Sequence, residues 1–219
     1  MSGLVKVGGA WKDVAGMSVK VDGAWKTVDK GYTNIAGTWK EFYAPVAGAF
    51  DFLQTTVLSS NAGTVTLSNL DAFAEYKQLQ IRMSVKAGAG DPNTDRLRVK
   101  VNNSDANLRG HSISATTASN LGSGTRTPYG GSLVFTDRLD NVNYTAIVLD
   151  IMNPFSSNNK TMRALVGTNH SVSGESVMEF LSIGYFSSTP ITSLTFGVGN
   201  TSMSSTVAAN SRFSIYGIR

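Results

Sequence analysis

The first forty residues repeat one short unit three times, at Val5–Lys12, Val19–Lys26 and Thr33–Lys40. Each unit carries a tryptophan followed by a lysine, and successive copies lie 14 residues apart. The pairs are Trp11 and Lys12, Trp25 and Lys26, and Trp39 and Lys40, and they contain all three tryptophans of the chain. A fixed period of this kind indicates that each copy forms one small supersecondary unit.

Each unit has the residue pattern of a β-hairpin. A β-branched run is followed by a pair of turn residues and then by an aromatic strand. The turn pairs are Gly8–Gly9, Asp22–Gly23 and Ala36–Gly37. Two-residue hairpin turns need positive φ, which glycine and aspartate adopt readily and alanine adopts poorly. With the turns at these positions, we expect Lys6 to lie opposite Trp11 and Lys20 opposite Trp25.

The hairpin segment is too short to stabilise itself. A lone two-stranded hairpin is marginal in water, and residues 1–44 are too few for a core of their own. We therefore expect this segment to be an anchor that docks on another protein. The expected contact residues are Trp11, Trp25, Trp39, Lys12, Lys26 and Lys40. The alternative is that the hairpins pack on the domain that follows them.

Composition excludes several classes of protein. The net charge of the 219 residues is only +4, with six basic and four acidic residues up to Ala44 and thirteen and eleven beyond it. No basic segment stands out, so we expect no nucleic-acid partner. Cysteine is absent, which excludes disulfides, a thiolate nucleophile and a cysteine zinc site. No apolar stretch approaches the roughly 18 residues of a membrane span, so we expect neither membrane insertion nor a conventional export signal.

After a short linker at Ala44–Gly48, the chain changes to many short runs of alternating apolar and polar residues. Leu79–Val85 and Leu97–Val101 alternate most clearly, and Tyr144–Ile151 has the composition of a strand buried on both faces. Further runs are Phe50–Leu58, Gly63–Leu67, Leu108–Ile113, Leu133–Thr136, Met162–Gly167, Val177–Phe186, Leu194–Val198 and Phe213–Ile218. Helical periodicity is confined to one turn at Asp71–Tyr76. The pattern predicts an all-β domain over residues 45–219, an antiparallel β-sandwich of the jelly-roll type.

The last strand of the sequence indicates its own position in the sheet. Phe213 and Ile215 alternate with polar residues on one face, while Tyr216 and Ile218 occupy the other. A terminal strand with large side chains on both faces suits a place between two neighbours. We expect it to be paired on both sides.

No catalytic constellation emerges from the sequence. His111 and His170 are the only histidines, and neither lies in an H-E-x-x-H motif. A G-x-S-x-G nucleophile motif is absent, and the scattered carboxylates nominate no glycosidase pair. We expect no catalytic residue and therefore no enzyme.

One loop has the beginning of a metal site. Asp91, Asn93 and Asp95 stand at alternate positions, the spacing with which many calcium loops begin. Leu97 and Val99 follow where further oxygen ligands would be needed. Aspartate and asparagine also favour turns for conformational reasons alone. Calcium is thus a candidate ligand of this loop, and no other cofactor is indicated.

Four loop residues form a second candidate site. Tyr129, Asn153, Phe155 and Asn158 combine aromatic faces with amide groups, as sugar-binding pockets do. Turn chemistry explains the asparagines equally well. Polar loops on a rigid sandwich are a common place for recognition, so host-surface glycans are candidate ligands.

Both ends of the chain resemble proteins of tailed bacteriophages. The units at Val5–Lys12 and Val19–Lys26 resemble the V-x-V-G-x-W-K repeats that open many phage tail and appendage proteins. The ending Ser211–Arg219 is similar to the S-x-F-S-[LI]-Y-G-[IL]-[KR] terminus of virion β-domains. Tyr76–Arg82 is similar to the strand that opens the main sheet of those domains. The chain lacks the long shaft of large fibres.

The resemblance implies a structural protein of the virion, assembled in the host cytoplasm. It implies a homotrimeric tail fibre or appendage, docked on other tail, baseplate or capsid proteins by its N-terminal repeats and displaying the sandwich toward the host surface. It implies no catalytic residues. The alternatives are a capsid decoration or head-fibre protein, and a non-viral carbohydrate-binding module whose repeats are a dispensable tail. The carbohydrate module would be a monomer.

Overall fold

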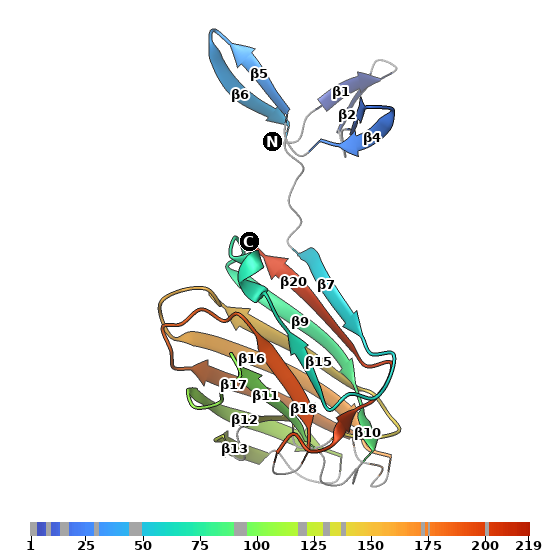
Figure 1. The fold of residues 1–219 in the computed structure, drawn as a ribbon, viewed down its shortest axis with the longest axis vertical. Helices are drawn as coiled ribbons and strands as arrows, with labels where there is room; N and C mark the ends of the chain where they lie inside the picture. Colours follow the sequence, from blue (N-terminus) through green and yellow to red (C-terminus); the bar gives the residue numbers. More distant parts are fainter. Residues whose placement is uncertain are drawn as a thin grey trace. The chain divides into compact units, whose positions relative to one another are not determined.

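The computed structural model describes residues 4–7, 10–13, 18–28, 31–43, 50–89, 96–117, 122–128, 132–136, 139–171, 174, 176–199 and 202–219. For residues 4–7, 10–13, 27, 33, 40–43 and 89 it describes the backbone only. The chain divides into two compact units, Met1–Ala49 and Phe50–Arg219. Both are built from antiparallel strands (Figure 1). The predicted all-β class is confirmed.

The first unit contains three separate two-stranded antiparallel sheets. They are β1 (Leu4–Val7) with β2 (Ala10–Asp13), β3 (Ser18–Val21) with β4 (Ala24–Thr27), and β5 (Gly31–Ile35) with β6 (Thr38–Tyr43). Lys6 is paired with Trp11 and Lys20 with Trp25, the pairings expected from the turn positions.

Two of the turns have the backbone conformation that their sequences require. Asp22 and Gly23 have φ values of 52° and 80°, and Ala36 and Gly37 have 52° and 83°. The alanine therefore adopts the left-handed region that it normally avoids. The Asn34 side-chain oxygen accepts a hydrogen bond of 2.9 Å from the Gly37 N–H, which stabilises this turn. The Gly8–Gly9 turn lies outside the described residues.

The second unit consists of two main sheets and a short strand pair. Its elements are β7 (Asp51–Val57), β8 (Thr64–Leu67), the 3-10 turn η1 (Leu70–Phe73), β9 (Gln78–Val85), β10 (Ala87–Ala89), β11 (Leu97–Val101), β12 (Leu108–Thr116), β13 (Gly122–Arg126), β14 (Leu133–Thr136), β15 (Thr145–Met152), β16 (Lys160–Asn169), β17 (Ser176–Tyr185), β18 (Leu194–Val198), β19 (Thr206–Val207) and β20 (Arg212–Ile218). The large sheet has the order β13-β12-β17-β16-β15-β9-β20-β7, and the small sheet has the order β14-β11-β18-β8. Strand β10 pairs with β19.

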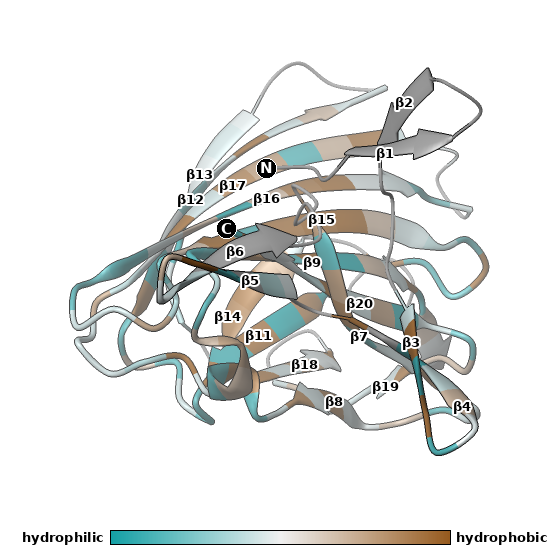
Figure 2. Cartoon of the chain, turned by 90° about the horizontal axis from the view of Figure 1, so that it is seen from above, coloured by the Kyte–Doolittle hydropathy of each residue, from teal (hydrophilic) through white to brown (hydrophobic). Residues whose placement is uncertain are grey.

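The two sheets pack against each other in a sandwich-like arrangement. Phe196 of the small sheet and Phe213 of the large sheet are both fully buried, with ring centroids 5.6 Å apart. Along β16 the buried residues alternate with exposed ones, so one face of the large sheet meets the core and the other faces outward. Figure 2 shows the hydrophobic segments along β15, β16 and β17. We call the face of the large sheet that is turned away from the small sheet the outer face.

A buried carboxylate connects two loops at one end of the sandwich. Asp140 is fully buried and accepts hydrogen bonds from the backbone N–H groups of Val142 (2.9 Å) and Ser171 (2.5 Å). The Ser171 hydroxyl (2.9 Å) and the Asn143 amide (3.1 Å) also donate to it. Burial raises the pKa of Asp140, but these donors outweigh burial and hold the pKa below its ordinary value.

The last strand has the position that its residues predict. β20 pairs with β9 on one side and with β7 on the other. Phe213 and Ile215 are fully buried. The prediction of a strand paired on both sides is confirmed.

Other details differ from the sequence-based expectation. Strand β13 lies outside the runs predicted to be strands, because its Gly-Ser-Gly-Thr-Arg sequence has no apolar alternation. Its residues are mostly exposed and need no such alternation. Tyr144–Ile151 is not buried on both faces, since Ala146 is exposed and Val148 is half-buried on the outer face. The expected helical turn at Asp71–Tyr76 is the shorter 3-10 turn at Leu70–Phe73.

Candidate functional site

The tryptophans of the hairpin unit are largely exposed. Trp25 is 72% exposed and Trp39 is 70% exposed, and Lys26 is exposed beside Trp25. Val19, Val21 and Ile35 are exposed as well. The side chains of Trp11, Lys12 and Lys40 lie outside the described residues. A two-stranded sheet has no opposite layer to cover these side chains, so the surface is available for a partner.

A second exposed apolar surface lies on the outer face of the large sheet. Ile113, Phe180, Leu165 and Val148 are direct cross-strand neighbours on β12, β17, β16 and β15. We call these four residues the apolar row. Leu165 is 52% exposed, although its strand buries every alternate residue against the core. Exposed apolar groups that adjoin one another in this way are typical of binding surfaces.

Beside the apolar row, small side chains leave a hollow in the sheet surface. The next cross-strand row contains Ala115, Met178, Gly167 and Ala146, and a Cβ placed on Gly167 would meet no atom within 4 Å. Two depressions, of about 560 and 470 Å³, share Gly167 and Met178 and are therefore continuous. We call the pair the trough. Its volumes are in the range of small-ligand sites, roughly 300–1,000 Å³.

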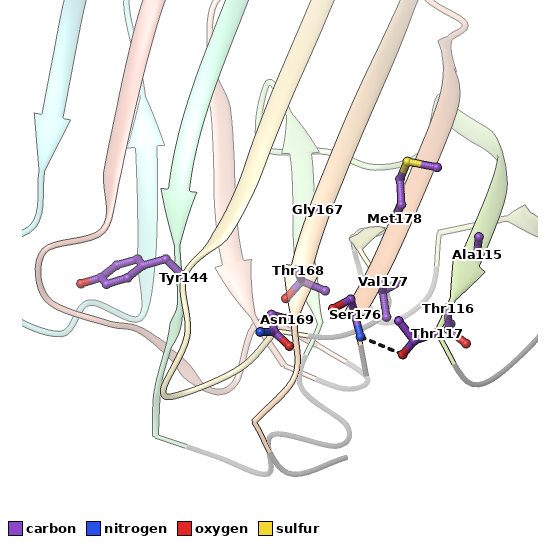
Figure 3. A pocket seen from close by; sticks show the side chains of 10 residues that line it. All are labelled: Ala115, Thr116, Thr117, Tyr144, Gly167, Thr168, Asn169, Ser176, Val177 and Met178. Carbon is purple, nitrogen blue, oxygen red and sulfur yellow. Dashed lines mark hydrogen bonds between the residues drawn. The ribbon is translucent and has the colours of Figure 1, made fainter. Parts of the chain in front are cut away.

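One end of the trough carries uncharged polar groups (Figure 3). Thr117, Asn169 and Ser176 line it where the strands end. The Ser176 N–H donates to the Thr117 hydroxyl at 3.2 Å. Tyr144 lies at the side of this end, with the Lys86 ammonium 5.1 Å from the centre of its ring. Hydroxyl and amide groups of this kind can donate to and accept from a ligand.

Arg82 lines the other end of the trough and is held in one orientation. Its guanidinium carbon lies 4.5 Å from the centre of the Tyr216 ring and 5.5 Å from that of Phe50. Its Nε donates to the Gln80 side-chain oxygen at 2.7 Å. Within the described residues, no acceptor contacts its two terminal nitrogens. A guanidinium fixed in this way presents a planar fork of donors to an oxyanion.

A hydrogen-bond network extends from Arg82 across the sheet. The Asp150 carboxylate accepts from the side-chain amides of Gln80 at 2.8 Å and Gln78 at 3.0 Å, and from the Nε of Arg163 at 2.9 Å. Asp150 and Gln80 are buried, whereas Arg163 is exposed. Arg163 neutralises Asp150, and the shared Gln80 links Asp150 to Arg82. The network therefore fixes the floor below Arg82, and no carboxylate of the described residues pairs with the Arg82 guanidinium.

The outer face of the large sheet carries an excess of positive charge. Within the described part of these strands, the outer face presents four arginines and one carboxylate, Asp150. The arginines are Arg82, Arg109, Arg163 and Arg212. The nearly even distribution of charge along the sequence does not reveal this excess. An anionic occupant is favoured over a second copy of the same face, which would bring the same four arginines.

Of the residues proposed from sequence as ligand-binding, the three that the structure describes, Asn153, Phe155 and Asn158, do not line the trough. Asn153 has a φ of 47° and its N–H donates to the Lys77 carbonyl at 2.7 Å, as expected of a turn residue. Phe155 is half-buried and packs against the core, and Asn158 is exposed in the same loop. Tyr129 and the calcium candidates Asp91, Asn93 and Asp95 lie outside the described residues. Sugar binding by this loop and calcium binding stay predictions.

The described ranges contain neither a cluster of metal ligands nor a membrane-spanning helix. No three histidine, aspartate or glutamate side chains there are placed to hold a metal ion. No helix in that part of the chain is long and apolar enough to cross a membrane. His111 is exposed on β12, whereas His170 is fully buried after β16.

Comparisons with models of protein families, with curated proteins and with solved structures found no match to this chain.

The sequence contained a signal for the apolar row that the strand assignment left unused. In the run Met162–Gly167, Arg163 and Leu165 are two positions apart and therefore lie on the same face of the strand. A leucine is thus expected on the polar, solvent-facing side. Phe180 likewise lies on the same face of its strand as Ser182. An apolar residue on the polar side of an otherwise regular strand marks an exposed apolar position.

Proposed function

We propose that this chain is a structural and adhesive component of a tailed-phage virion, a trimeric tail fibre or appendage. The N-terminal hairpins would dock on another virion protein, and the β-domain would be displayed for contact with the host surface. The carrying observation is the exposure of Trp25 and Trp39 on hairpins that have no second layer. Exposed tryptophans on a segment without its own core are expected to be covered by a partner.

The sheet topology supports the finer features of this proposal. The chain alternates between sheets, with β7, β9 and β20 in the large sheet and β8, β11 and β18 in the small one, as a jelly-roll type of sandwich would require. Strands β13 and β7 are the two edge strands of the large sheet. Closed oligomerisation is a common way to cover the edges of a sheet. The trimer itself rests on the resemblance of the chain ends to phage proteins.

The docking role is tested by replacing Trp11, Trp25 and Trp39 with alanine together. Truncation of an interface aromatic at a hot spot costs about 2 kcal/mol or more, so the triple variant should be lost from purified particles. Particles would be assembled with a tagged chain and probed after density-gradient purification. The matched control replaces Phe180, an exposed aromatic of the second unit, and should leave incorporation unchanged. Normal incorporation of the triple variant would refute docking by the hairpins.

Location and oligomeric state need separate measurements. Immunolabelled particles viewed by negative-stain microscopy would separate a tail position from capsid decoration. Light scattering of the free chain at micromolar concentration should give three copies. A monomer at all concentrations would instead favour the carbohydrate-binding module.

A further inference from the structure

We propose that the trough on the outer face binds an acidic saccharide, with its oxyanion group on Arg82 and its ring faces on the apolar floor. This names a ligand class for the host-contact part of the proposed function and in that sense rests on it. The binding itself is a property of the free chain and can be measured without particles.

Among the described residues that line the trough, Arg82 is the only charged one. Stacking on Tyr216 and the Nε hydrogen bond to Gln80 hold the guanidinium plane, while the terminal nitrogens meet no acceptor in the described part of the chain. Little side-chain entropy then remains to be lost when an oxyanion binds. A carboxylate accepts two parallel hydrogen bonds from such a fork, which makes Arg82 selective for planar anions.

The rest of the trough suits sugar rings. Gly167 and Ala146 form an open floor beside Leu165 and Val148, and apolar surface of this kind packs against the C–H faces of pyranose rings. At the far end Thr117 and Asn169 offer uncharged hydrogen-bonding groups for hydroxyls. Neighbouring strands lie about 4.8 Å apart, so the four strands from β9 to β17 span roughly 15 Å, enough for a few sugar units.

The alternatives to a saccharide fit less well. A second copy of the outer face would bring four arginines against four arginines. A protein partner typically needs about 800 Å² of surface on each side. The trough is instead a shallow hollow of the size that suits small ligands. An acidic peptide is the natural competitor, because it also offers carboxylates.

The test is calorimetric titration of the full chain with an oligomer of galacturonic acid. The methyl-esterified oligomer has the same rings without the charge and is the matched ligand control. We expect binding of the acid form and at least tenfold weaker binding of the ester. Raising the salt concentration should weaken the acid form only. An equally strong response to both ligands, or none to the acid form, would overturn the proposal.

Variants then assign the binding to the trough. Arg82→Ala should weaken binding roughly 10- to 100-fold, since a hydrogen bond to a charged group is the main interaction lost. Arg82→Lys keeps the charge but not the planar fork and should lose most of the affinity. Gly167→Leu places a side chain in the open space of the trough floor without changing the charge. It should also abolish binding, because the leucine occupies the place of the sugar ring. Thermal unfolding of each variant would verify that it is folded.

The matched control is Arg109→Ala. Arg109 is an exposed arginine of the same face whose guanidinium bonds the Ala106 and Leu108 carbonyls, so its loss changes the net charge as Arg82→Ala does. Binding should change less than twofold. A loss equal to that of Arg82→Ala would mean that only overall charge matters and would overturn the specific site.

A poly-glutamate peptide separates the two sources of carboxylate. If the peptide binds and the oligouronide does not, the trough is a protein-docking surface and the saccharide proposal is wrong. A negative result with the oligouronide leaves the docking role of the tryptophans untouched, because particle incorporation of the triple variant decides that independently.

Discussion

Replacement of Phe213 by alanine should remove a buried aromatic contact between the two sheets. Phe213 is fully buried near the end of the chain, and its ring lies 5.6 Å from that of Phe196 in the opposite sheet. Phe196 in turn has an edge contact with Phe135 at 6.2 Å, so the cavity would open beneath a chain of three rings. Truncation of a buried phenylalanine costs about 3–5 kcal/mol. This is a large fraction of the roughly 5–15 kcal/mol that stabilises a typical domain.

The expected effect is large enough to measure by thermal unfolding of the full chain. For a domain of this size each kcal/mol corresponds to about 2–4 °C in Tm, so the variant should melt about 6–20 °C below the wild type. Near-UV circular dichroism reports the loss of packing, and urea unfolding should give a lower midpoint. Phe213→Leu retains more of the apolar volume, so its Tm should lie between those of the wild type and Phe213→Ala.

The matched control is Phe180→Ala, which removes the same atoms from the exposed outer face. We expect its Tm to change by less than about 4 °C, since exposed sites rarely cost more than about 1 kcal/mol. If Phe213→Ala and Phe180→Ala melt at the same temperature, the two sheets do not depend on this contact and the core assignment is wrong.

Two further substitutions test the buried carboxylate and the packing of glycine. Asp140→Asn should lose about 1–3 kcal/mol of stability in urea titrations at neutral pH, because its four donors lose a charged acceptor. Because the pKa of Asp140 is lowered in the folded protein, its contribution to stability is fully present above the ordinary value near 3.8 and is lost as pH falls through the folded pKa. The free energies of unfolding of the wild type and of Asp140→Asn, plotted against pH, should therefore converge in acid. Parallel curves would contradict the assignment. Gly217→Ala should lower the Tm, since the new Cβ would come within 2.4 Å of the Tyr76 ring, costing about 1–3 kcal/mol. Gly167→Ala, in open space on the same sheet, should leave the Tm unchanged or raise it, and equal effects of the two alanines would refute the steric argument.

Local patterns in the sequence determined the strand content and the hairpin turns of this protein. Period-two alternation predicted most strands of the second unit, because side chains of a strand alternate between two faces whatever its neighbours are. The turn pair Asp22–Gly23 likewise has a conformational preference that does not depend on the rest of the chain. The position of β20 could be inferred because Phe213 and Tyr216 require burial or cover on opposite faces.

The tertiary structure alone decided which residues of the outer face become neighbours. Arg82 belongs to β9, Leu165 to β16 and Phe180 to β17, and their proximity follows from a sheet order and register that no local pattern encodes. The same holds for β13, whose small polar residues become a strand only because the edge of β12 offers hydrogen-bond partners. Period-two alternation predicts the face of the strand on which a residue lies. The cross-strand neighbours of that residue depend on long-range pairing between strands. The sequence therefore predicted the strands, and only the assembled sheet brought Arg82 to the edge of an apolar trough.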